Sequence, residues 1–108
     1  MAKFAVFFRF KGETIKAMME RPSDRAAVVR TLCEAAGARM ESYYLMFGEW
    51  DGMVIVDGPD SRTAAAVSLA VSSTGAFAQL ATHELLDSDE FSDALQRGRD
   101  LTYSPPGA

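Results

Sequence analysis

The chain has 108 residues, 48% of them hydrophobic, and a formal net charge of −4. This length predicts a single domain, residues 1–101, followed by a flexible C-terminal tail at residues 102–108. The acidic balance and the scattered Lys and Arg residues argue against nucleic acid and against an anionic membrane surface as partners, because both are bound by clustered positive charge.

The cysteine and histidine content limits the chemistry further. Cys33 is the only cysteine and His83 the only histidine, so the sequence predicts no internal disulfide and no Cys/His cluster at metal-ligand spacing. We therefore expect no metal and no cofactor. The N-terminal apolar run is too short for a signal peptide and no stretch reaches transmembrane length, which predicts a cytoplasmic location.

Residues 3–10 are rich in aromatic and β-branched side chains and predict the first strand. Side chains alternate across a strand, so one face is wholly apolar and the other mixed. The apolar face carries Phe4, Val6, Phe8 and Phe10, and the mixed face carries Lys3, Ala5, Phe7 and Arg9. Both faces of this strand should therefore be at least partly covered.

Two helices are predicted next. Residues 13–20 place apolar side chains on one helical face, and the Arg21-Pro22 pair then forces a break. The second helix is expected to start between Pro22 and Asp24, with Asp24 favoured by the helix dipole. Gly37 stands where a left-handed C-terminal cap is expected.

The centre of the chain predicts a β-hairpin with strands at residues 39–47 and 53–57. Its tip is Gly48-Glu49-Trp50-Asp51-Gly52, where we expect the two glycines to supply the positive φ angles of a tight turn. Asp51 is interpreted as a turn former whose carboxylate accepts hydrogen bonds from nearby backbone N–H groups.

The last part of the chain predicts a helix, a strand and a final helix. Asp60 is the expected N-cap of a helix at residues 61–73, whose scarcity of charge predicts burial on more than one side. A fourth strand follows at residues 76–85. Asp87 and Glu90 have the spacing of a capping box, with Leu86 and Phe91 as its hydrophobic staple, and the last helix should end near residue 99.

This order predicts an α+β fold, the ferredoxin-like βαββαβ arrangement with an extra C-terminal helix. Right-handed crossovers place the first and third strands in the centre and the second and fourth at the edges. Helices can then cover only one face of the sheet. The other face carries Phe7 and, depending on register, either Tyr43, Leu45 and Phe47 or Tyr44 and Met46. This is too much apolar surface for a monomer to expose, which predicts a homodimer formed through this sheet face.

Several segments resemble the GYD-domain family. The central one is Gly48-Glu49-Trp50-Asp51, followed by β-branched residues and Pro59-Asp60, although tyrosine is usual where this chain has Trp50. Residues 3–10, 22–37 and 86–91 and the Tyr43-Tyr44 pair fit the same resemblance. It implies the dimeric α+β barrel and assigns no activity or catalytic residue.

His83 and Arg9 are the first candidate site residues. Histidine exchanges protons near neutral pH, so a general acid or base would be sought at His83, whereas the simpler interpretation is a polar residue at the surface or dimer rim. Arg9 lies on the mixed face of a central strand, where a charge needs a partner. An ion pair with Glu41 or Asp57 is favoured over a ligand carboxylate.

Tyr43, Tyr44 and Trp50 are the aromatic candidates, because each offers an apolar plate with one polar tip for a flat ligand. The same side chains could equally anchor a dimer interface, and that interpretation is favoured. No catalytic residues can be assigned, so whether the chain is an enzyme stays open.

The favoured hypothesis is a small homodimer that binds a small molecule or a partner. The alternative is a cofactor-independent monooxygenase or isomerase acting on a small aromatic substrate, and a structural subunit of larger rings is a third possibility.

Overall fold

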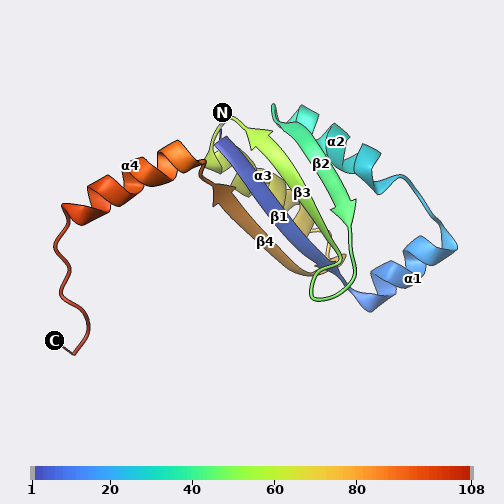
Figure 1. Cartoon of the computed structure of the whole chain (residues 1–108). Coiled ribbons are helices and arrows are strands. Elements are labelled where there is room, and N and C mark those ends of the chain that lie inside the picture. Colours follow the sequence, from blue (N-terminus) through green and yellow to red (C-terminus); the bar gives the residue numbers. More distant parts are fainter. Residues whose placement is uncertain (1, 108) are drawn as a thin grey trace.

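A computed structural model describes residues 2–107 and shows eight helices and strands (Figure 1). In chain order they are β1 (Ala2–Phe10), α1 (Gly12–Glu20), α2 (Arg25–Ala35), β2 (Arg39–Leu45), β3 (Gly52–Gly58), α3 (Ser61–Ser72), β4 (Phe77–Leu85) and α4 (Ser88–Arg99).

The four strands form one antiparallel sheet in the order β2-β3-β1-β4. The first and third strands are therefore central and the other two are edges, which confirms the ferredoxin-like prediction. Helices α2 and α3 pack on one face, α2 against β2 and α3 against β4 and β3. Figure 1 shows that no helix within residues 2–107 lies across the opposite face of the sheet, which we call the open face.

The core lies between the sheet and these two helices. Phe4, Phe8 and Phe10 of β1 are buried there, as the alternation of the strand predicts. They are joined by Val54 of β3 and by Cys33 of α2, which is only 1% exposed. The parity of β1 thus decides which face of the sheet the helices cover.

Aspartate side chains cap three of the helices. The carboxylate of Asp60 accepts a hydrogen bond from the Thr63 N–H at 2.8 Å, and Asp87 with Glu90 forms the predicted capping box. Asp24 caps α2 by accepting from the Ala27 N–H. This helix begins at Arg25, just after the predicted start between Pro22 and Asp24, because Asp24 is its N-cap.

The hairpin connection is longer than predicted. Strand β2 ends at Leu45 and β3 begins at Gly52, so the connection runs over residues 46–51. Gly48 has the expected positive φ, at 135°, whereas Gly52 does not and lies in the strand. Gly52 is required for space instead, since a Cβ built there would lie 2.3 Å from Cζ of Phe8.

Helix α3 is less buried than its composition predicts. None of its residues is buried within this chain, and Leu69 is 69% exposed. Only the side toward the sheet is covered, so the prediction of burial on more than one side is wrong for the single chain. An alanine-rich apolar surface remains in contact with solvent.

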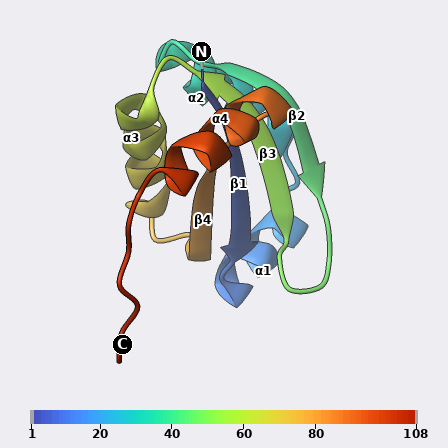
Figure 2. The same cartoon turned by 60° about the vertical axis from the view of Figure 1, so that its left-hand side comes forward.

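Helix α4 extends away from the rest of the molecule, followed by residues 100–107 without helix or strand (Figures 1 and 2). It has no buried residue, and Phe91 and Leu95, four positions apart, are 54% and 59% exposed. Over residues 2–107, no helix has the length and apolar character needed to cross a membrane.

Candidate functional site

The open face of the sheet is the candidate site. In β1 the residues opposite to the core parity are Lys3, Ala5, Phe7 and Arg9, and the strand register places their neighbours on the same face. Ala5 lies between Ile55 of β3 and His83 of β4, and Phe7 lies between Met53 and Ala81. The middle of this face is thus apolar.

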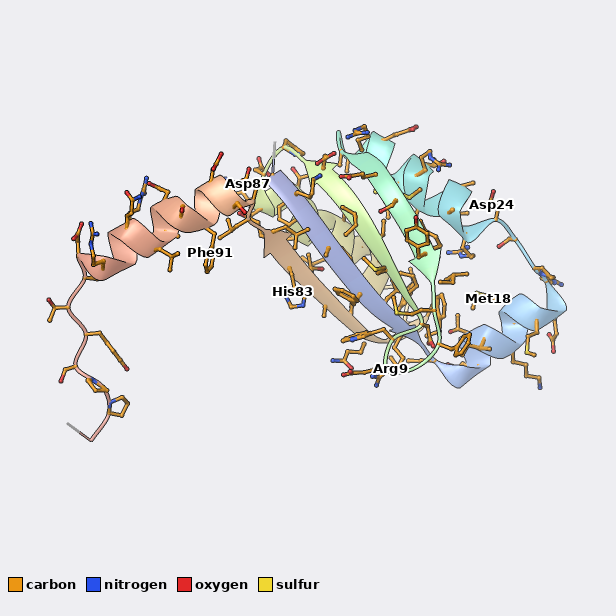
Figure 3. All side chains as sticks on the ribbon, in the orientation of Figure 1. Arg9, Met18, Asp24, His83, Asp87 and Phe91 are labelled. Atoms are coloured by element: carbon orange, nitrogen blue, oxygen red, sulfur yellow. The ribbon has the colours of Figure 1, made fainter. Side chains whose placement is uncertain are left out.

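An aromatic row crosses this face with Phe7 at its centre. The Phe7 ring centroid lies 5.8 Å from that of Trp50 and 6.1 Å from that of His83, the latter pair edge to face. The three rings come from β1, from the hairpin connection and from β4. Aromatic rings at these separations attract one another and present a broad apolar surface. Figure 3 shows the position of His83 on β4.

Arg9 continues the row at the hairpin end of β1 (Figure 3). Its guanidinium carbon lies 5.5 Å from the centre of the Trp50 ring, and its Nε donates a 2.8 Å hydrogen bond to the carbonyl oxygen of Glu49. This is a cation-π contact supported by a backbone acceptor. The guanidinium therefore holds the indole ring against the sheet.

The ion pair predicted for Arg9 is wrong, because both proposed acidic partners bind other cations. Glu41 lies 2.7 Å from Nζ of Lys3, and Asp57 lies 2.6 Å from a guanidinium nitrogen of Arg39. The hydrogen bond that the Lys3 ammonium donates to the Glu41 carboxylate raises the pKa of Lys3. These pairs form the polar end of the open face, away from the aromatic row.

Asp51 fixes the connection that carries Trp50. Its carboxylate accepts a 2.9 Å hydrogen bond from the N–H of Phe10, and its own N–H donates to the carbonyl oxygen of Phe8 at 2.9 Å. The interpretation of Asp51 as a local turn former is therefore wrong, since its partners lie in β1. The effect is to hold Trp50 beside Phe7.

The two tyrosines lie on opposite faces of the sheet. Tyr44 is paired with Met53 and lies on the open face, 65% exposed. Tyr43 is paired with Val54 on the helix side, where its ring lies 5.9 Å from Phe8 and burial raises its pKa. The structure thus brings together Arg9, Trp50 and His83, keeps Tyr44 on the same face and places Tyr43 elsewhere.

Phe7 is the centre of the aromatic row, whereas the sequence assigns it only to the predicted dimer face and not to the candidate binding residues. Its parity with Arg9 in β1 was the available signal. Within residues 2–107, no group of three His, Cys, Asp or Glu side chains is arranged to hold a metal ion. The groups on offer are aromatic plates, one guanidinium and one imidazole, which suit the binding of a flat aromatic molecule.

Comparison with known proteins defines the fold and the family. No curated protein matches the sequence. The structure is similar to a solved one described as the crystal structure of FFRP-DM1, with a TM-score of 0.55 and 13% sequence identity, covering 80% of this chain and 100% of that one. At this identity the likeness shows the fold alone. The model of the GYD domain matches residues 4–95, and the chain therefore belongs to the GYD-domain family.

Proposed function

We propose that the protein acts as a homodimer whose two open sheet faces meet and bind a flat aromatic small molecule between them. The observation that carries this proposal is the row of Phe7, Trp50 and His83 on a sheet face that no helix covers. Contiguous apolar surface of this kind is characteristic of interaction sites. In a two-fold symmetric dimer the open face of one copy packs against the open face of the other, so a single surface forms both sides of the interface.

Helix α4 supports the same proposal. An isolated helix of 12 residues is marginal in water, and most helices gain their stability from packing an apolar side. The capping box and the ion pair between Asp93 and Arg97 stabilise α4 locally, but Phe91 and Leu95 have no core to enter. We expect the second copy to cover this side.

The expected ligand is aromatic because the row offers ring faces and edges and few hydrogen-bonding groups. A planar molecule could stack on Trp50 or Phe7, with the guanidinium of Arg9 at one end and the imidazole of His83 at the other. A cytoplasmic location is part of the proposal, and the single free cysteine agrees with it.

The test is the binding of 2-naphthol, measured by isothermal titration calorimetry, because this readout needs no tryptophan and Trp50 is the only one in the chain. Trp50→Ala is expected to weaken binding about tenfold, because an aromatic contact with its buried area is worth on the order of 1.4 kcal/mol. Tyr103→Ala is the matched control, since this ring is 76% exposed in the tail. Equal affinity of the Trp50 variant and the native protein would refute the proposed site.

A second candidate function is a cofactor-independent monooxygenase or isomerase acting on a small aromatic substrate. It is favoured by the position of His83, the only histidine, beside Phe7 on the proposed binding surface. His83→Ala separates the two functions, because an enzyme would lose turnover of a substrate that still binds. A binding protein would retain its ligand and show no turnover in either form.

A further inference from the structure

We propose that the layer between the helices and the sheet binds an uncharged aliphatic chain in a cavity that opens between α2 and α3. This site lies on the opposite side of the sheet from the open face and does not depend on dimer formation. It is carried by two adjoining hollows in the described chain, one inside the core and one at its surface.

The inner hollow has a volume of about 60 Å³ and no polar atom facing it. Its walls include Val6 of β1, Val56 of β3, Leu32 and Cys33 of α2 and Val67 of α3. A space of this size is several times the roughly 10–15 Å³ that one water molecule needs, but water also requires polar partners. The hollow therefore stays dry and favours hydrocarbon.

The outer hollow is an open groove of about 230 Å³ between α2 and α3. It shares Leu32 and Val67 with the inner one, so the two adjoin, and four alanines line the rest: Ala35, Ala36, Ala66 and Ala70. With small side chains at these four positions, only Leu32 and Val67 stand between the groove and the inner hollow, and a ligand would enter by displacing them. The groove accounts for part of the exposed alanine-rich surface of α3.

Three polar side chains, Cys33, Tyr43 and Ser68, surround the inner hollow without turning a polar atom toward it, and none is charged at neutral pH. Burial raises the pKa of the Cys33 thiol and that of the Tyr43 hydroxyl, so neither ionises there. The Ser68 hydroxyl already shares a 2.8 Å hydrogen bond with Thr82. An ionised head group would find no partner in the inner hollow. The aliphatic chain of the ligand is therefore expected to lie in the inner hollow and any polar end of the ligand in the groove.

The shape of the two hollows decides the class of ligand. The inner one is small and bounded on one side by Phe8, Tyr43 and Phe77, and the ring centroids of Tyr43 and Phe77 lie 5.9 and 5.7 Å from that of Phe8. An unbranched chain entering from the groove fits this form, whereas a bulky ring system does not.

The experiment titrates the protein with 1-octanol and follows the methyl resonances in a carbon-proton NMR spectrum, with 1-adamantanol as the bulky comparison. Octanol is expected to shift the methyl signals of Val6, Leu32 and Val67, and adamantanol is not. In Ala70→Phe a ring fills the groove at an exposed position, so octanol affinity should fall at least tenfold.

The matched control is Ala65→Phe, also exposed but on the side of α3 toward β4. It should bind octanol as the native protein does. Three results would each overturn the proposal: no methyl shifts at the inner hollow, shifts confined to open-face residues such as Ile55, or unchanged affinity in Ala70→Phe. The methyl spectrum of each variant also reports whether its fold is retained.

Discussion

Phe7→Asp is expected to convert the proposed dimer into a monomer. Phe7 lies at the centre of the open face, between Trp50 and His83, so the change would place one carboxylate from each protomer within the interface. A buried unpaired charge costs about 3–5 kcal/mol. The dimer dissociation constant should therefore rise at least about a thousandfold, since each 1.4 kcal/mol is a factor of ten.

Sedimentation equilibrium of the native protein and the variant over a range of concentrations measures this change. Leu69→Asp is the matched control, because it introduces the same charge at an apolar residue that is 69% exposed on the helix side. It should leave the dimer intact. If Phe7→Asp remained dimeric and Leu69→Asp dissociated, the interface would lie on α3 and the open face would have another role.

Gly52→Ala is expected to destabilise the fold by about 2–3 kcal/mol through overpacking. The added Cβ would lie 2.3, 2.6 and 3.0 Å from three carbons of the Phe8 ring. Phe8 is 5% exposed and its ring packs against those of Phe10, Tyr43 and Phe77, with centroids 5.3 to 5.9 Å apart. Any shift of the ring away from the added Cβ therefore disturbs this aromatic packing.

Urea unfolding at one fixed protein concentration measures this loss. Gly58→Ala is the control at the other end of β3, where a Cβ would lie an ordinary 3.4 Å from the Phe4 ring. Its free energy of unfolding should change by less than about 1 kcal/mol. A similar loss in both variants would mean that the strand backbone, and not the Phe8 contact, requires glycine.

The parts of the fold that the sequence predicts well are those decided by neighbouring residues. Alternation in residues 3–10 places Phe4, Phe8 and Phe10 in the core, and local spacing identifies the caps at Asp60 and Asp87. These features depend on periodicity and on hydrogen bonds across three residues, which a short stretch of sequence contains in full.

The candidate site was harder to predict because it depends on contacts between distant segments. The Asp51 carboxylate accepts a hydrogen bond from Phe10, and Gly52 leaves room for the Phe8 ring, in each case across about forty positions. The residues next to Asp51 and Gly52 in the sequence do not indicate these distant partners. The register of β2 is a second example. It shifts between Met40 and Ser42, so alternation alone could not tell which tyrosine faces the helices.

The composition of α3 misled the prediction for a different reason. Its alanines and valines indicate burial, but the single chain covers only the side toward the sheet and leaves Leu69 exposed. Sequence shows that a surface is apolar and does not show what covers it. Part of this surface lines the groove between α2 and α3, where we propose that an aliphatic ligand enters.

The central claim is that two copies meet through the open sheet face, and isotope-filtered NOE spectroscopy tests it most directly. The sample mixes carbon-13-labelled and unlabelled protein, so the filter selects contacts between protomers. The predicted result is intermolecular NOEs at the methyl groups of Ile55 and Met53 and at the Phe7 ring. Intermolecular NOEs confined to α3, or none at concentrations where the native protein is fully associated, would contradict it.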